Sequence, residues 1–266
     1  MTDLASLGKE LEETLRLDTR LLAYQKLDHA EDLDRIRGVK TFDRPLTFCQ
    51  LPALVRVYGW TVGVRGTDPM NERCKNLCGL KDATPEEIWV EAAVMATTWM
   101  PSHEESLKQQ ADYPRITAGE AIVLAPLTEG KIDPDAILIY GNVAQIMLLL
   151  CGLQKEKYEE FPFSFLGEGD CTNTLARCCS TGKISLGLGC FGERSMGQMT
   201  DGEIILAMPP QEMERALSGL KHLSTIGFSY PLRIIGAGHD PFPELAEFYP
   251  PDRVGAAVTR ALQSRK

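Results

Sequence analysis

The order of hydrophobic and polar residues predicts helices and strands that follow one another along the whole chain. Four leucines between Leu4 and Leu15 recur at helical spacing, with charged residues between them. Residues 120–127 and 135–140 are almost continuously apolar, which is typical of central strands buried on both faces. The same reasoning predicts helices over residues 3–16, 47–58, 85–99, 143–153, 209–223 and 251–260, and strands over residues 20–27, 60–65, 120–127, 135–140, 183–188 and 203–208.

This mixture of elements predicts an α/β (or α+β) fold with a mixed central sheet flanked by helices. The chain has 266 residues, of which 44% are hydrophobic, so it can bury a full core without disulfides or metals as staples. We expect a single compact domain over residues 1–266, with two closely packed lobes as the alternative. Its core spans about residues 20–225, and residues 227–266 form an extension rich in proline, glycine and aromatic residues.

The net charge of −9 and the isoelectric point near 5.1 argue against nucleic acid and anionic membranes as partners. The first residues lack the basic and apolar regions of a signal peptide, and the longest apolar run, residues 146–151, is too short to cross a bilayer. We therefore expect a soluble cytoplasmic protein that acts on a small-molecule substrate. Assembly into a homo-oligomer is compatible with this composition.

The most distinctive stretch, residues 167–208, holds four of the eight cysteines among many glycines. A helix is expected from Asp170 or Cys171 to Thr181, and Cys190 then follows on a glycine-rich turn. A thiol in the first turn of a helix is favoured as thiolate, the form that ligates metals and attacks electrophiles. Metal or cluster ligation, thiol chemistry and simple core packing all remain open for these cysteines: Cys171, Cys178, Cys179 and Cys190.

The other cysteines give weaker signals. Cys74 and Cys78 are four residues apart, so on a helix both would lie on one face, but metal sites more often use a C-x₂-C spacing. Cys151 lies within an apolar helical run and is expected in the core. The polar segment over residues 101–119, with His103, is expected to be a solvated loop.

A second candidate site lies where the strand over residues 135–140 meets the following helix. Small ligands often bind at such corners of α/β proteins. Asn142 and Gln145 are the polar residues there, and we assign them as candidate cofactor-binding residues. Helix capping by Asn142 is the alternative explanation.

Several segments together resemble the uncharacterised family DUF169: FCQLPALVRVYGW, the segment from Cys74 to Leu80, IVLAPL, PDAILIYGNVAQIMLLL, and GDCTNTLARCCSTGKISLGLGCFGER followed by DGEIILAMP. They occur in the family's order over roughly residues 20–225. The resemblance implies cysteines at Cys49, Cys74 and Cys171, a glycine-framed position at Cys190, and an arginine at Arg194. Cys78 and the Cys178–Cys179 pair depart from the family pattern. The resemblance also implies a bacterial or archaeal cytoplasmic protein, often from anaerobes, with no settled activity.

The leading hypothesis is that Cys49, Cys74, Cys171 and Cys190 ligate one iron–sulfur cluster, with 4Fe–4S as first choice and zinc as second. The protein would then be a lyase or oxidoreductase of anaerobic metabolism, using the cluster as Lewis acid or redox centre, with Arg194 in a catalytic role. The alternatives are a metal-free enzyme with Cys171 or Cys190 as nucleophile, and a non-catalytic small-molecule-binding or accessory protein. Cys178 and Cys179 are predicted to stay outside a site built on Cys171, because a seven-residue helical separation spans about 10 Å.

Overall fold

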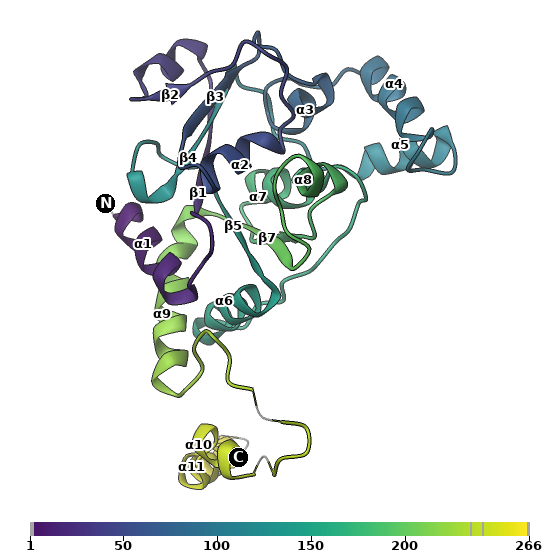
Figure 1. Ribbon diagram of the computed structural model, residues 1–266. Coiled ribbons are helices and arrows are strands. Elements are labelled where there is room, and N and C mark those ends of the chain that lie inside the picture. Colours follow the sequence, from purple (N-terminus) through teal and green to yellow (C-terminus); the bar gives the residue numbers. More distant parts are fainter. Residues whose placement is uncertain (1–2, 235, 241, 265–266) are drawn as a thin grey trace.

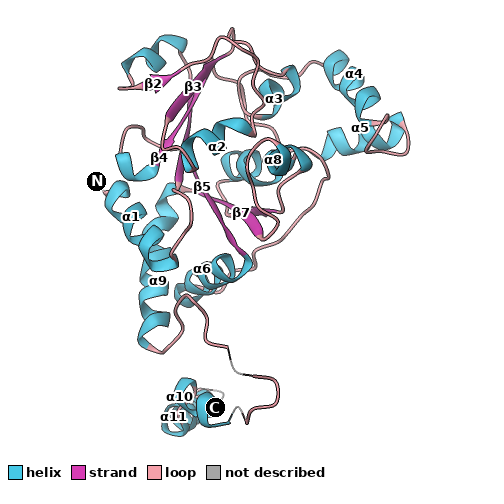
Figure 2. Cartoon of the chain, viewed as in Figure 1, coloured by secondary structure: helices cyan, strands magenta, loops and turns pink. Residues whose placement is uncertain are grey.

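The computed structural model describes residues 3–234, 236–240 and 242–264, and it confirms the α/β fold (Figures 1 and 2). A seven-stranded mixed sheet has the order β2-β3-β4-β1-β5-β7-β6. The short edge strand β2 runs parallel to β3, and the remaining pairs are antiparallel. The strands are β1 (Leu22–Leu27), β2 (Val39–Lys40), β3 (Thr61–Arg65), β4 (Ala121–Pro126), β5 (Ala136–Asn142), β6 (Ser185–Gly187) and β7 (Glu203–Met208).

Helices cover both faces of this sheet. Short 3₁₀ turns η1 (Ala30–Arg35), η2 (Leu127–Glu129) and η4 (Pro210–Glu212) connect elements, and η3 (Thr172–Ala176) is a π-helical segment. The α-helices are α1 (Leu4–Leu15), α2 (Gln50–Arg56), α3 (Glu72–Leu77), α4 (Pro85–Met95), α5 (His103–Asp112), α6 (Val143–Glu156), α7 (Arg177–Thr181), α8 (Phe191–Ser195), α9 (Met213–Thr225), α10 (Phe242–Phe248) and α11 (Pro251–Gln263).

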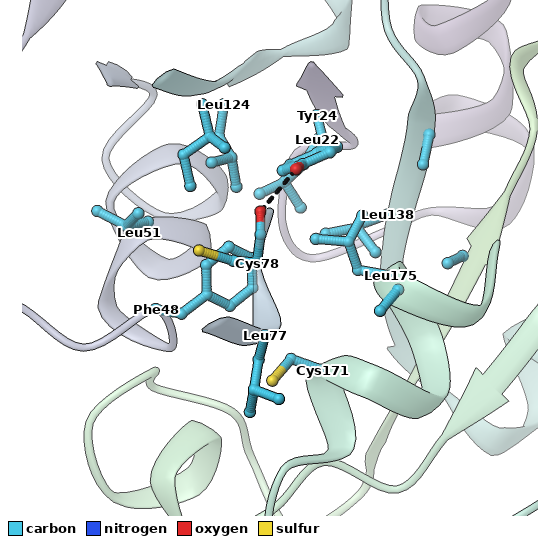
Figure 3. Close-up of a cluster of buried hydrophobic side chains, with 14 of the residues drawn as sticks. Leu22, Tyr24, Phe48, Leu51, Leu77, Cys78, Leu124, Leu138, Cys171 and Leu175 are labelled. Atoms are coloured by element: carbon cyan, nitrogen blue, oxygen red, sulfur yellow. Dashed lines mark hydrogen bonds between the residues drawn. The ribbon is translucent and has the colours of Figure 1, made fainter. Parts of the chain in front are cut away.

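The two central apolar runs are strands because alternate side chains enter two different cores. Along β5, Leu138 and Tyr140 pack against α2, α3 and η3, whereas Ile137 and Ile139 pack against α1, α6 and α9. The first of these cores is shown in Figure 3. Burial on both faces leaves no polar position in such a strand, which explains the near-continuous hydrophobic pattern.

Arg56 is a charged residue in this interior, with only 2% of its surface exposed. Its guanidinium pairs with Glu203 at 3.0 Å, stacks 4.4 Å above the Tyr140 ring, and donates to the carbonyls of Gly197 (3.2 Å) and Gln198 (2.6 Å). These contacts attach α2 to β5, β7 and the segment after α8. Arg56 therefore fixes the position of Cys49, which precedes α2, relative to Cys190, which precedes α8.

Two predictions about polar and apolar segments are wrong. The segment with His103 is not a loop: Ser102 caps α5, and the imidazole hydrogen-bonds the Trp89 carbonyl at 2.9 Å and packs edge-on against the indole. The helix was missed because α5 has no apolar face: its buried residues, Ser106, Gln109 and Gln110, are polar. Cys151 is exposed on α6, because the helix turns this position away from the core that its neighbours enter.

The C-terminal extension lies outside the sheet. Figure 1 shows α10 and α11 beyond a connecting segment that leaves α9. The Phe228 ring stacks on Phe248 of α10 at a centroid distance of 4.6 Å, while no residue of α11 is buried. Among the described residues, no helix has both the length and the apolar character needed to span a membrane.

Candidate functional site

Cys49, Cys74, Cys171 and Cys190 line one cavity of about 360 Å³, which we call the cysteine cavity. The four residues come from four segments that are far apart in the sequence. Cys49, Cys171 and Cys190 are each no more than 8% exposed, and Cys74 is partly exposed. More exposed side chains form a further part of the lining: Trp99, Phe191 and Met196, together with Arg73 and Glu168.

Each of the four cysteines stands at the beginning of a helical element. Cys49 and Cys190 immediately precede α2 and α8, and Cys171 immediately precedes η3. Cys74 is the third residue of α3, where its backbone N–H donates to the capping side chain of Asn71. Backbone N–H groups in the first turn of a helix lack partners within the helix, but here some of them are already bonded: that of Cys74 to Asn71 and that of Phe191 to Glu168.

The turn that carries Cys190 is attached to the helix that carries Cys171 through Asp170. The buried Asp170 carboxylate accepts the backbone N–H of Gly189 at 2.7 Å. A Cβ at Gly187 would lie only 2.1 Å from that carboxylate, and Gly189 has a φ of +75°. The glycines around Cys190 are therefore needed for the close approach of the two segments.

The thiols of Cys49 and Cys190 interact directly. The hydrogen bond from the Cys49 thiol is the main reason that the pKa of Cys190 is lowered to about 6, and the backbone N–H groups of Glu193 and Gly169 lower it further against the effect of burial. The same pairing raises the pKa of Cys49. Cys190 is consequently the thiolate of this cavity at neutral pH.

Burial controls the other two thiols. It raises the pKa of Cys171 and of Cys74, although the backbone N–H of Phe48 and the Arg73 guanidinium oppose the effect at Cys74. Arg73 lies between the cavity and α4, where its Nε donates to Glu91 at 2.5 Å and its Nη2 donates to the Glu168 carbonyl at 2.8 Å. Both thiols would release their protons on binding a metal centre, because a cation favours the thiolate.

Glu193 is a residue of this region that sequence analysis missed. It is 2% exposed, accepts from the Tyr140 hydroxyl at 3.3 Å, and has one carboxyl oxygen without a hydrogen-bond partner among the described residues. Burial, and next the neighbouring Cys190 sulfur, raise the pKa of this carboxyl. The sequence did place Glu193 about one helical turn after Cys190, in the segment GCFGER, and this spacing could have indicated that the carboxyl lies near the thiol.

The remaining cysteines lie elsewhere. Cys78 packs among Phe48 and Leu51, and its carbonyl accepts the Tyr24 hydroxyl at 2.7 Å (Figure 3). Cys178 belongs to the same core, and burial alone raises its pKa. Cys179 lines a different pocket, with Lys26 and Asp135.

Asn142 and Gln145 do not line the cysteine cavity. They form a reciprocal capping box at the start of α6, and the Gln145 amide also donates to the Leu15 and Arg16 carbonyls at 3.0 Å. Their polar groups are thus occupied in joining α6 to α1. This geometry matches the capping alternative and gives no support to a cofactor-binding role.

Arg194 lies beside the cysteine cavity but not in its lining. Its Nη1 donates to the Thr200 carbonyl at 2.6 Å, and its Nη2 donates to the Leu188 carbonyl. It also lines a second, adjoining pocket with Cys190 and Phe191. These contacts make Arg194 a residue that positions the Cys190 turn, and its catalytic role stays a prediction.

No group of three or more His, Cys, Asp or Glu residues in the described ranges is arranged to hold a single metal ion. Tetrahedral zinc would require its ligand sulfurs to be about 3.8 Å apart, since each lies about 2.3 Å from the metal. A 4Fe–4S cube carries its thiolates on four separate irons, about 6–7 Å from one another. Because the Cys49 thiol hydrogen-bonds the Cys190 sulfur, these two sulfurs would have to move apart to ligate separate irons of a cluster.

Comparison with known proteins gives a family but no activity. The model of the family DUF169, described as "Uncharacterised ArCR, COG2043", matches residues 10–219. The uncharacterised protein MJ0308 of Methanocaldococcus jannaschii is 20% identical over 221 residues, which cover 82% of this chain and 94% of that protein. No solved structure matches. Since the family match includes the whole sheet, all four cysteines of the cavity and most of α9, the chain belongs to the DUF169 family.

Proposed function

We propose that this protein binds an iron–sulfur cluster, 4Fe–4S in type, through Cys49, Cys74, Cys171 and Cys190. The observation that carries the proposal is that these four residues line one cavity although up to 141 positions separate them in the sequence. Soft thiolate ligands without histidine favour an iron–sulfur cluster or zinc. Because the four thiols come from separate segments of the chain, we favour the iron–sulfur cluster, which is larger, over a single zinc ion.

The surroundings of the cavity support a negatively charged cluster. The N–H groups of Gly169 and Glu193 approach the Cys190 sulfur, and that of Phe48 approaches Cys74. Hydrogen bonds to the sulfurs are one means by which proteins set the potential of a cluster. Gly192 supports the same reading, because its Cα faces the sulfurs of Cys49 and Cys190 and a side chain there would enter the space between them.

The cluster would supply electron transfer or a Lewis-acidic iron, which is why we propose an enzyme of the lyase or oxidoreductase class acting on a small organic substrate. The chain's own residues would hold that substrate and exclude water. Trp99, Phe191 and Met196 lie at the exposed part of the lining. All eight cysteines are free thiols, which supports a reducing cytoplasm and anaerobic metabolism as the setting.

The test is purification of the full chain from anaerobically grown cells under strict exclusion of oxygen. We expect about four iron and four sulfide per chain, with a broad visible absorbance that oxygen bleaches. The Cys171→Ser variant should lose most of the iron, whereas the matched Cys178→Ser variant should keep it, because Cys178 is packed in the core. A colourless, iron-free protein, before and after anaerobic reconstitution with iron and sulfide, would refute the proposal.

The lowered pKa of Cys190 favours a second candidate, a metal-free enzyme that uses this sulfur as its nucleophile. Glu193, whose carboxyl pKa is raised by burial and by the neighbouring Cys190 sulfur, would then be a candidate general acid. Titration with a thiol reagent separates the two proposals. Rapid modification of one cysteine in the protein as isolated supports the nucleophile, whereas protection of the four cavity cysteines until an iron chelator is added supports the cluster.

A further inference from the structure

A second pocket of about 320 Å³ adjoins the cysteine cavity, and we call it the side pocket. It shares four residues with the cysteine cavity, so the two spaces have a common wall: Trp99, Glu168, Cys190 and Phe191. Phe165, Met100 and Arg194 line the side pocket alone, and Met196 lines the cysteine cavity alone. A molecule in the side pocket would therefore lie against Cys190 without displacing any group bound to the four cysteines.

The walls of the side pocket are aromatic and exposed. Trp99, Phe165 and Phe191 have exposed fractions of 48%, 59% and 62%. The rings of Trp99 and Phe191 are 5.9 Å apart at an interplanar angle of 47°. Large apolar side chains that gather around a concave space, rather than being scattered singly, indicate a ligand-binding site.

Apart from the sulfur of Cys190, the charged side chains of the side pocket form one pair of opposite sign. Glu168 and Arg194 contribute one negative and one positive group, and both are already engaged with the backbone. The Glu168 carboxylate accepts the Phe191 N–H at 2.7 Å, and the Arg194 guanidinium donates to the carbonyls of Thr200 and Leu188. The pocket therefore favours a ligand without net charge. An anion would lie beside the Glu168 carboxylate, and a cation would lie beside the Arg194 guanidinium.

We infer that the side pocket binds an uncharged molecule with a flat aromatic ring, packed against the rings of Trp99, Phe165 and Phe191 with one edge toward Cys190. Aromatic rings gain from stacked or edge-to-face contact beyond the burial of area, so a flat ring should be preferred to a saturated ring of similar size. The binding follows from the pocket itself. Its role as the substrate site of the enzyme rests on the proposed function.

The test compares two probes with the same amide group, naphthalene-2-carboxamide and its saturated decahydro counterpart, by anaerobic isothermal titration calorimetry. We expect the aromatic probe to bind about tenfold more tightly than the saturated one. The Phe165→Ala variant should lower its affinity about tenfold, whereas Met196→Ala, which changes only the cysteine cavity, should leave it within about twofold. Both side chains are exposed, so neither variant should unfold the protein.

Equal affinity for the two probes, no binding of either, or unchanged affinity in Phe165→Ala would overturn the inference. The Cys74→Ser variant separates it from the proposed function, because Cys74 does not line the side pocket. Binding of the aromatic probe that persists in the iron-depleted Cys74→Ser variant supports the side pocket independently of the cluster, whereas a wild-type protein that binds the probe but holds no iron supports the side pocket and refutes the cluster. An iron-loaded protein that shows no preference for the aromatic probe refutes the side pocket and leaves the cluster intact.

Discussion

Replacement of Gly192 by alanine should separate cluster binding from stability. Gly192 lies in α8 and is buried, and a Cβ added there would lie 3.1 Å from the Cys49 sulfur and 3.5 Å from the Cys190 sulfur. The methyl group would thus occupy the space onto which the two sulfurs face. Alanine is favoured over glycine in a helix by about 1 kcal/mol, while mild overpacking costs about 1–3 kcal/mol. The two effects largely offset each other, so the free energy of unfolding should fall by no more than about 2 kcal/mol.

The iron content should change far more than the stability. One of the four ligands, Cys49, would have to move by a few tenths of an ångström to relieve the contact, and cluster ligation tolerates little displacement. We expect the Gly192→Ala variant to retain less than about a fifth of the wild-type iron when both are purified anaerobically. The reason is that disturbing the residues that orient metal ligands typically lowers the affinity for the metal about 10- to 100-fold. Iron and sulfide analysis, with urea unfolding of the same samples, measures both quantities.

A matched control is available in the C-terminal helix. Gly255 lies within α11, and a Cβ there meets no atom within 4 Å. The Gly255→Ala variant therefore carries the same change in helix propensity and should keep the full iron content. If Gly192→Ala also keeps the full iron content, the two sulfurs do not face a common ligand, and the reasoning that joins Cys49 to Cys190 is refuted.

Three further predictions follow from the same geometry. Cys74→Ser should lose most of the iron while Cys178→Ser loses little, as measured by iron analysis of anaerobic preparations. In cluster-free protein, alkylation of Cys190 should be half-maximal near pH 6, because the thiolate predominates above its lowered pKa. Cys49→Ala should move that midpoint upward, since the main cause of the lowered pKa is removed; a peptide map of iodoacetamide labelling against pH measures this. Arg56→Met should lower the free energy of unfolding by about 3–5 kcal/mol, measured in urea, because it leaves the largely buried Glu203 carboxylate without its cation and the Gly197 and Gln198 carbonyls without their donor.

Much of the fold could be predicted from the sequence because local pattern and tertiary burial agree. The segments over residues 120–127 and 135–140 are almost continuously apolar, and the structure buries both faces of the strands that they form, β4 and β5. The sequence could not show that α5 is a helix, since its charged residues resemble a solvated loop until Ser102 is seen to cap it. The prediction for Cys151 was wrong for a related reason. An apolar run shows that a segment is hydrophobic, but which of its residues are buried depends on how the helix packs.

The candidate site divides in the same way. The glycines around Cys190 indicated a close approach, and the structure shows the partner to be Asp170, nineteen positions earlier in the chain. The sequence could not show which thiols share a cavity, because Cys49 and Cys74 belong to segments whose distance from the glycine-rich stretch is set by the sheet. Asn142 and Gln145 were chosen for their place at a strand–helix corner, but their side-chain oxygens are used by the helix cap and the Gln145 amide N–H groups by the Leu15 and Arg16 carbonyls at the end of α1.

The sheet explains why four distant segments can meet at one cavity. Leu138 and Tyr140 of β5 face the same core as Phe48, Leu77 and the π-helical segment η3. The helical elements that follow Cys49, Cys74 and Cys171 are thus packed on one face of the sheet and begin near one another. A π-helical turn widens a helix, shifts the facing of its side chains, and is found frequently at functional sites. At η3 it lies directly after Cys171, so the irregular backbone belongs to the segment that brings this thiol to the cavity, and the regular helix resumes before Cys178, whose side chain enters the core instead.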